Sequence, residues 1–498
     1  MKSKKIQNAI GMVDSDLLER ADKYTKKPKR KHIRWIAPLA AALVIVILSG
    51  VIFGGSIREL FTDSNTDPTS TERVTLAPEI EFKPVSLKPY CLSEAVYPER
   101  VINPNIDHTN LEEWHEERRT RRENFGAGDN LDEFFVKTID EFLKDSKGEN
   151  IVYSPLNVYM ALAMIAETTE GDSRQQILDL IGAEDIESLR TQANAMWNAN
   201  YQDDGVTTSK LASSLWLDRG LEYSEDLLNN LAEYYYASTF NGEMGSEEYN
   251  DALKTWINEQ TGNLLREQIA DLELSPDTIM TLATTVYFKD QWVNGFSEGN
   301  TYREVFHSAD GDVNIPFMHR SDFSGAYYWG ENFSATSKAL EGRGNMYFIR
   351  PDDGVDVEDL LSDSETMSFI MYDEKYEYKN SKYTKVNMSI PKFDVSSSMD
   401  LKEGIENLGV IECFTSAGDF AVFYDSEYDN GVYLSEIEHS ARVKIDEEGV
   451  EAAAVVCATL AGSAMPEDEV DFVLDKPFIF VITNDDELPL FVGVVNNP

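Results

Sequence analysis

The chain has 498 residues, with 44 Lys or Arg against 89 Asp or Glu, and its formal net charge is −45. So much negative charge disfavours binding to nucleic acid or to an anionic lipid surface. The three cysteines, Cys91, Cys413 and Cys457, are too few for a disulfide framework. The sequence contains no His pair at metal-binding spacing, no phosphate-cradling Gly loop and no Cys-x-x-Cys motif. We therefore expect no metal, no cofactor and no nucleic-acid partner.

An uncharged apolar stretch covers residues 35–55, and six Lys or Arg residues lie between positions 26 and 34. About twenty apolar residues suffice for a helix to cross a bilayer, and basic flanks stay on the cytoplasmic side. The pattern predicts a cytoplasmic segment at 1–34, a transmembrane helix at 35–55 and an extracellular remainder. The alternative is a cleaved signal peptide, which would make the protein secreted.

Residues 56–125 separate this apolar stretch from a densely patterned region. The composition up to residue 86 is rich in Ser, Thr, Pro and Asp, which is typical of a linker. Residues 111–122 form a charged helical pattern with opposite charges four positions apart. We expect an extracellular linker followed by a solvated helical extension, which Trp114 could dock onto the next domain.

The main domain is expected at 126–498. Ser154 and Pro155 are typical of a helix N-cap and of a first helical position, and they precede an apolar run. A second helix is expected at 251–268, and a central strand at 279–288, where apolar and β-branched residues follow one another. Helices early in the domain and strands late in it indicate an α+β fold.

The segment 447–466 carries the strongest functional signal. An acidic turn at Glu447, Glu448 and Gly449 opens it, and thirteen uncharged residues follow Glu451. Every second residue from Val450 to Leu460 is small or apolar, so one face of a strand formed there could be buried without burying a charge. The segment is also rich in Ala, which leaves a buried helix as the alternative interpretation.

The sequences on either side of this segment favour the strand over the buried helix. A strand pattern at 433–446 precedes it, and two more at 475–482 and 490–496 end the chain. Together these features resemble the C-terminal part of the serpins, a family of serine protease inhibitors. Further stretches resemble the family in the same order, namely 150–157, 211–216, 286–292 and 304–307. The resemblance reaches back to about residue 128, and the lack of disulfides in an exported domain suggests a bacterial origin.

The resemblance implies a serpin fold with about three β-sheets, eight to nine helices and an exposed reactive-centre loop. It implies an inhibitor and not an enzyme, acting as a suicide substrate whose cleaved loop inserts into the central sheet. The hinge of that loop would be Glu447, Glu448, Gly449, Val450, Glu451, Ala452, Ala453 and Ala454. The residues implied where the sheet opens are Ser154, Pro155, Asn157, Trp292 and His439, with a structural role for His439.

The chain departs from the family pattern in this region. Thr284 stands where the family usually has Asn, Asp290 where it has Gly, and Asn157 where it has a small hydroxyl residue. Val450 replaces the usual Thr or Ser of the hinge. These departures are expected to change the detailed contacts of the opening region, and Asn157 could still bond to His439.

The scissile bond is expected at Ser463–Ala464, counted from Glu447. Counting back from the next strand moves it later, so Gly462–Ser463 and Ala464–Met465 stay open. The small side chains and the lack of a basic residue before Lys476 favour elastase-like or subtilisin-like serine proteases as the covalent acyl partner. A monomer is expected. The alternative function is a serpin-fold binding protein that does not inhibit.

Overall fold

The computed structural model describes residues 83–106, 110–144, 146, 148–276, 278–371, 378–420, 423–424, 433–434, 437–450 and 468–498. The apolar stretch at 35–55 and most of the loop segment therefore lie outside the described residues. Within the described part, no helix combines the length and the apolar character needed to cross a membrane.

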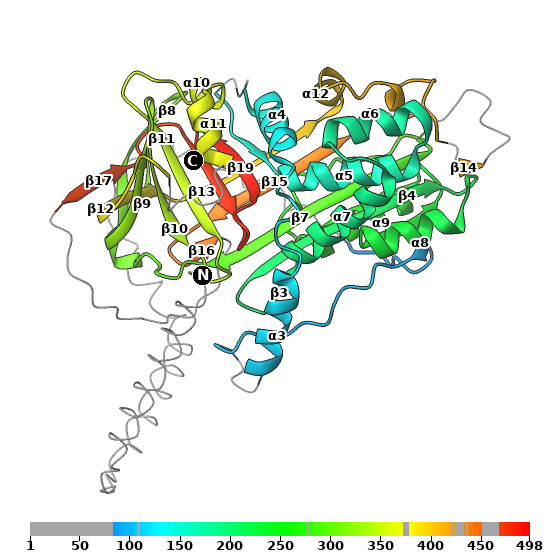
Figure 1. Ribbon diagram of the computed structural model, residues 1–498, viewed down its shortest axis with the longest axis horizontal. Coiled ribbons are helices and arrows are strands. Elements are labelled where there is room, and N and C mark those ends of the chain that lie inside the picture. Colours follow the sequence, from blue (N-terminus) through cyan, green and yellow to red (C-terminus); the bar gives the residue numbers. More distant parts are fainter. Residues whose placement is uncertain are drawn as a thin grey trace, which may run out of the picture. The chain divides into compact units, whose positions relative to one another are not determined.

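The central sheet of the domain mixes parallel and antiparallel strands (Figure 1). In spatial order its strands are β1 (Cys91–Ser93), β6 (Ala237–Gly242), β4 (Thr208–Asp218), β7 (Met280–Gln291), β16 (Gly449–Val450), β15 (Glu438–Ile445) and β13 (Phe393–Asp400), with β3 (Gln202–Asp203) paired to β4. Strands β16 and β7 are neighbours in this sheet although they are far apart in the sequence, so the fold places the hinge segment beside the predicted central strand.

The second sheet carries the C-terminus in its interior. Its strands in order are β17 (Glu469–Val473), β12 (Ser381–Pro391), β9 (Gly311–Trp329), β10 (Phe333–Ala339), β11 (Asn345–Pro351), β18 (Phe478–Thr483), β19 (Pro489–Val495) and β2 (Ile151–Tyr153), with β8 (Thr301–Ser308) paired to β9. A small third sheet pairs β14 (Phe423–Tyr424) with β5 (Glu222–Tyr223). Strands β18 and β19 are buried at every position, which explains why their residues are apolar except for Thr483 at the end of β18.

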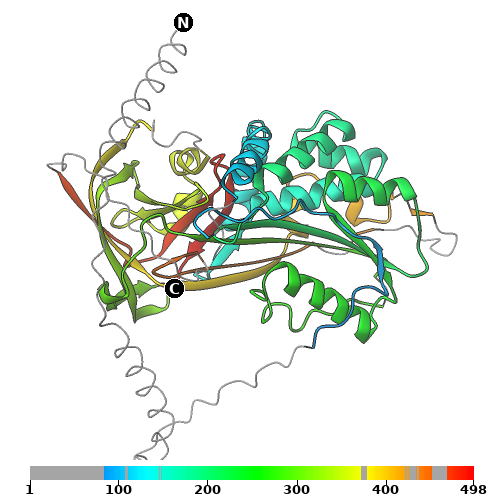
Figure 2. The same ribbon diagram turned by 90° about the horizontal axis from the view of Figure 1, so that it is seen from below.

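The helices pack on both large sheets. They are α3 (Leu111–Arg122), α4 (Asp132–Leu143), α5 (Pro155–Thr168), α6 (Gly171–Ile181), α7 (Ile186–Asn200), α8 (Glu225–Tyr234), α9 (Glu247–Gln260), α10 (Val357–Leu361), α11 (Ser364–Met371) and α12 (Lys402–Asn407), with short 3-10 turns at Glu298–Asn300 and Glu412–Phe414. Figure 2 shows the group α5–α8 on one face of the long strands and α9 on the other. The α+β prediction is confirmed.

Nine of the ten α-helices in the described residues lie after residue 126, in line with the eight to nine expected of the domain, and the tenth, α3, precedes it. One detail of the prediction is wrong. The helix expected at 251–268 begins at Glu247 and ends at Gln260. It ends there because Gly262 and Asn263 both take the left-handed conformation, with φ of 59° and 66°.

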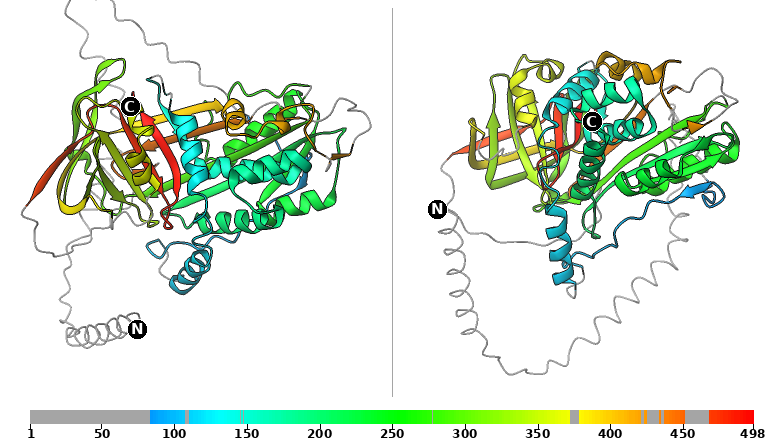
Figure 3. Two further views of the ribbon diagram at one scale, coloured as in Figure 1. Left: turned by 45° about the horizontal axis from the view of Figure 1, so that its top comes forward. Right: turned by 45° about the vertical axis from the view of Figure 1, so that its right-hand side comes forward.

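The described residues of the N-terminal arm, 83–106 and 110–124, run along the outside of the domain (Figure 3). Its strand β1 forms the edge of the central sheet by pairing with β6, and its helix α3 carries Trp114, whose indole N–H bonds to Asp204 at 3.2 Å. The expected boundary at residue 126 stays a prediction. The contacts nevertheless show that much of the expected linker and extension lies against the domain.

Candidate functional site

The hinge begins inside the central sheet. Gly449 pairs with Gln291 of β7, Val450 pairs with Asp290, and Val450 also lies opposite Ile445 of β15. A Cβ on Gly449 would come within 2.1 Å of the Asp290 carbonyl oxygen, so this position requires glycine. The Val450 side chain is 2 % exposed. The alternating apolar face of the loop segment is therefore already buried at its first residue, Val450.

A turn after β7 holds the acidic start of the hinge. The backbone N–H of Trp292 donates to the Glu448 carbonyl at 2.9 Å, and its indole N–H donates to the Asp446 carbonyl at 2.9 Å. The Phe296 N–H donates to the Glu447 carbonyl at 2.8 Å. Trp292, which the family resemblance placed where the loop first enters the sheet, thus contacts the two residues on either side of Glu447.

Glu447 is tied by its side chain as well. Its carboxylate accepts from Lys392 at 2.6 Å and from the Thr301 hydroxyl at 2.7 Å. Burial alone would raise the pKa of this carboxyl, but these two donors outweigh it and lower the pKa. Sequence reasoning missed Lys392 and Thr301, because they lie far from the hinge along the chain and no local pattern marks them.

The residues expected in the opening region are brought together, with one change of partner. The His439 ring accepts from the Ser154 N–H at 3.2 Å, and the Ser154 hydroxyl accepts from the Asn157 N–H at 3.3 Å. The Asn157 side chain donates to the Thr284 carbonyl at 3.3 Å, instead of bonding to His439. Pro155 is the first residue of α5, as expected for a helix that Ser154 caps.

His439 is uncharged in this setting. Its side chain is 3 % exposed, and burial lowers its pKa to about 4. Because Nε2 accepts the Ser154 N–H, the ring proton lies on Nδ1. The histidine therefore has the environment of a structural hydrogen-bond acceptor.

A cavity of about 310 Å³ separates β7 from β15 beyond the hinge. Its walls include Leu282 and Thr284 of β7, Ser440 of β15 and Leu253 of α9. In the ordering of the central sheet, β7 and β15 are not direct neighbours, since β16 lies between them and covers only two residues. The remaining length is the place where a further strand could pair on both sides.

The far end of the loop segment is also defined. Strand β17 pairs in parallel with β12, from Glu469 opposite Lys385 to Val473 opposite Ser389. The expected reactive residues Gly462, Ser463, Ala464 and Met465 lie outside the described residues, as do the hinge residues Glu451, Ala452, Ala453 and Ala454. The described residues on either side of this segment lie in the central sheet at Val450 and in the second sheet at β17.

One buried acid stands at the point where the sheet would open. Asp290 is 1 % exposed, and its carboxylate accepts from the Thr207 hydroxyl and from the backbone N–H groups of Gly342 and Gln291. Burial raises its pKa to about 7, although these three donors act against that rise. Sequence comparison identified the position as unusual, but only the fold shows that the acid is buried next to the hinge.

Among the described residues, no three His, Cys, Asp or Glu side chains are grouped so that they could hold a metal ion. The expectation of no metal stays a prediction.

Comparison with known proteins places these features in one family. The family model described as "Serpin (serine protease inhibitor)" matches residues 129–498. The chain is 28 % identical over 371 residues to Serpin-ZX of Arabidopsis thaliana, covering 71 % of this chain and 93 % of that protein. It is 28 % identical over 392 residues to neuroserpin of Mus musculus, covering 74 % and 91 %.

Solved structures show the same fold. The native state of Tengpin, a thermophilic serpin, has a TM-score of 0.65 at 22 % identity, covering 81 % of this chain and 97 % of that one. The native stressed conformation of AtSerpin1 from Arabidopsis has a TM-score of 0.64 at 24 % identity, covering 75 % and 98 %.

Proposed function

The chain belongs to the serpin family, whose members are generally protease inhibitors, and on this premise we propose that it inhibits serine proteases as a suicide substrate. The observation that carries the proposal is the gap between β7 and β15, which the hinge already occupies at Gly449 and Val450. In this proposal the protein is not an enzyme, because it is consumed in one turn of the protease's own reaction.

The covalent step belongs to the protease. Its serine oxygen adds to the carbonyl carbon of Ser463, the bond to the nitrogen of Ala464 breaks, and the protease histidine protonates the leaving amine. The acyl bond then tethers the protease to the new end of the loop. Insertion of residues 451–462 between β7 and β15 carries the tethered protease away before water can cleave the ester.

Strand pairing supplies the driving force. Each backbone hydrogen bond gained is worth about 1 kcal/mol net, so about ten new bonds would supply on the order of 10 kcal/mol. The alternation that begins with the buried Val450 continues through Ala452, Ala454 and Val456, so the inserted strand would place small apolar side chains on the buried face.

Small residues around the scissile bond favour elastase-like or subtilisin-like proteases, whose primary pockets are narrow. The bond at Ser463–Ala464 is proposed first, with Gly462–Ser463 and Ala464–Met465 as alternatives.

The second candidate function is a serpin-fold binding protein that does not inhibit, and the departures at Thr284 and Asp290 favour it.

The cellular setting is also a proposal. The uncharged stretch at 35–55 and the basic residues before it support a single-pass membrane protein with an extracellular, monomeric serpin domain, or a secreted one if the segment is cleaved. The relatives named above come from a plant and an animal, so they lend no support to the expected bacterial origin.

Incubation with pancreatic elastase tests the proposal. We expect a protease complex that survives SDS electrophoresis, and mass spectrometry should find the cut between residues 462 and 465. The variant Ala452→Arg places a charge on the buried face and should be cleaved without forming the complex. The matched variant Ala453→Arg places the same charge on the outer face and should still form the complex. Cleavage without any complex, across elastase and subtilisin, would support the non-inhibitory alternative.

A further inference from the structure

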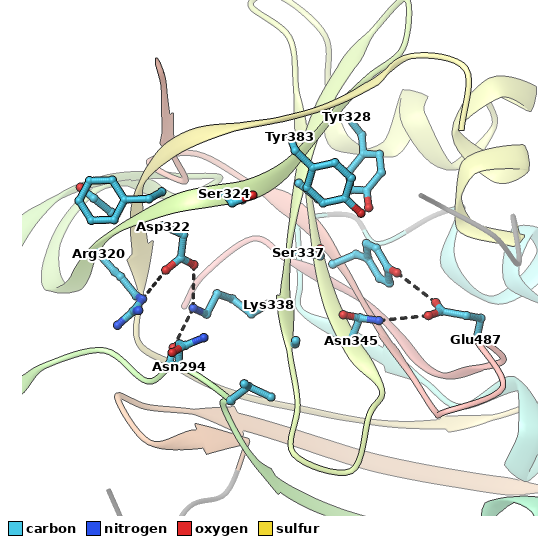
Figure 4. Close-up of a pocket in the computed structure, with 17 residues that line it drawn as sticks. Asn294, Arg320, Asp322, Ser324, Tyr328, Ser337, Lys338, Asn345, Tyr383 and Glu487 are labelled. Atoms are coloured by element: carbon cyan, nitrogen blue, oxygen red, sulfur yellow. Dashed lines mark hydrogen bonds and ion pairs between the residues drawn. The ribbon is translucent and has the colours of Figure 1, made fainter. Parts of the chain in front are cut away.

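A second cavity lies behind the turn that holds the hinge. Its volume is about 580 Å³, and its lining includes Asn294 of that turn, Arg320 and Asp322 of β9 and Lys338 of β10. Phe323 and Tyr383 also line it and are 56 % and 60 % exposed, so the cavity is open to solvent on their side. Figure 4 shows Arg320, Asp322, Lys338 and Asn294 joined in one chain of contacts.

The floor of this cavity holds two cations and one anion. The Lys338 ammonium donates to Asp322 at 2.9 Å and to the Asn294 carbonyl at 2.8 Å, and its side chain is 3 % exposed. The Arg320 guanidinium donates to the other oxygen of Asp322 and to the Gly295 carbonyl at 2.7 Å. Within the described residues, Asp322 is the one carboxylate in contact with either cation.

These cations have hydrogen-bonding capacity left. An ammonium has three N–H donors and a guanidinium five, whereas the contacts above use two on each side chain. Burial lowers the pKa of Lys338 despite the presence of Asp322, which shows that one carboxylate does not fully offset its desolvation. With two cations against one carboxylate, this group carries an uncompensated positive charge, which favours an anion locally.

The second carboxylate in the cavity lining, Glu487, already has hydrogen-bond partners. Glu487 accepts from Asn345 at 3.1 Å and from the Tyr347 hydroxyl at 3.0 Å, and Figure 4 shows it apart from the cation group. The lining also includes four aromatic residues, namely Tyr328, Tyr347, Tyr383 and Phe323. The cavity thus combines a cationic floor with aromatic walls.

From this arrangement we propose that the cavity binds a small aromatic carboxylate. Its carboxylate would take the spare donors of Lys338 and Arg320, and its ring would lie against the exposed rings of Phe323 and Tyr383. A planar carboxylate suits the guanidinium fork of Arg320. No covalent step is involved.

The same cations connect the cavity to the hinge. They bond the carbonyls of Asn294 and Gly295, and the next residue, Phe296, donates to Glu447. A Cβ on Gly295 would lie 2.8 Å from the Glu447 carbonyl oxygen, so this turn is in close contact with the hinge. A bound carboxylate would hold both cations in place and slow the opening of the sheet. This second part rests on the proposed function, whereas binding itself does not.

Calorimetric titration of the intact, uncleaved chain with 4-hydroxyphenylacetate tests binding, and 4-hydroxyphenylacetamide serves as the uncharged probe. We expect saturable binding of the acid, at least tenfold tighter than that of the amide, and weaker at high salt. Arg320→Gln should weaken binding at least tenfold, and so should Lys338→Met if that variant folds. The control Arg303→Gln removes an exposed arginine of the neighbouring strand β8 and should leave binding unchanged. Equal binding of acid and amide, or an unchanged affinity in Arg320→Gln, would overturn the proposal.

The coupling has its own measurement. After a single cut in the loop by any protease, insertion is followed as the gain in resistance to urea over time. A saturating concentration of the acid should slow this gain at least twofold in the wild type and leave it unchanged in Arg320→Gln. Binding without slowing would overturn the coupling alone. Failure of the cut protein to gain resistance at all would instead count against the proposed function.

Discussion

At the scale of single residues, Asp290 and His439 show how burial sets charge near the hinge. Burial raises the pKa of Asp290 to about 7 and lowers that of His439 to about 4. The folded protein therefore binds an extra proton at Asp290 between about pH 4 and 7, and stability falls there as pH rises. At His439 the unfolded chain binds the extra proton, so stability rises over about pH 4 to 6.5. The two effects oppose each other.

Because of this opposition, the pH dependence of the wild type alone is not diagnostic. We expect Asp290→Asn to lack the falling contribution, so that its stability relative to the wild type increases from pH 4 to 7 and then levels off. Over this pH range, the free energy of unfolding of the variant relative to the wild type should rise by at most about 4 kcal/mol, which corresponds to a shift of about three pKa units. Urea unfolding midpoints at several pH values measure it. The exposed acid Asp471, changed to Asn, should show no such trend, and a difference independent of pH would contradict the assignment.

At the scale of elements, helix α3 links the N-terminal arm to both large sheets. Asp485, in the turn between β18 and β19, faces Arg118, Arg121 and Arg122 at 3.6, 3.6 and 3.3 Å. The Arg121 side chain is 6 % exposed and also bonds to Gln202 of β3. When a charge is buried to this degree, loss of its partner strongly destabilises the folded protein.

Removal of the shared acid should therefore destabilise the domain. We expect Asp485→Ala to cost about 3 kcal/mol, because it removes the carboxylate that faces both buried arginines, Arg118 and Arg121. The control Arg119→Ala removes an arginine of the same helix that is 67 % exposed and paired only with Glu116 in the described contacts, and it should cost less than about 1 kcal/mol. Thermal unfolding of the two variants gives the comparison. Equal melting temperatures would show that α3 does not contribute to the fold.

At the scale of the whole molecule, the central sheet has a place for one more strand. The hinge occupies only two residues of the gap between β7 and β15, and the uncharged run that follows is long enough to continue it. A cut in the loop should therefore raise the stability of the entire domain, because both edges of the gap gain a partner.

A matched pair of variants tests this rearrangement. Val456 falls on the buried face that begins with Val450, whereas Val455 falls on the outer face. After a cut near residue 463, we expect the wild type and Val455→Lys to gain resistance to heat, and Val456→Lys to gain much less. Differential scanning calorimetry before and after cleavage measures the change. Equal gains in the two lysine variants would show that the loop does not insert in this register.

Much of the fold could be predicted because its signals are local or ordered along the chain. The Ser154 cap, the β-branched run of β7 and the apolar terminal strands each follow from neighbouring residues. The end of α9 was misjudged, because the left-handed residues Gly262 and Asn263 interrupt an otherwise helical pattern. The partner of Asn157 was also misjudged, because which acceptor it reaches depends on how α5 lies against β7.

The sequence by itself determined the family, the α+β class and the alternating face of the loop segment, because periodicity and the order of motifs can be read along the chain. Only the tertiary structure decided that Val450 is already buried between β7 and β15, that Asp290 pairs with it, that Lys392 bonds to Glu447, and that Arg320 and Lys338 bond to the turn beside the hinge. The physical reason is that charge pairing and burial depend on distance in space, and these residues are separated by tens to more than a hundred positions along the chain.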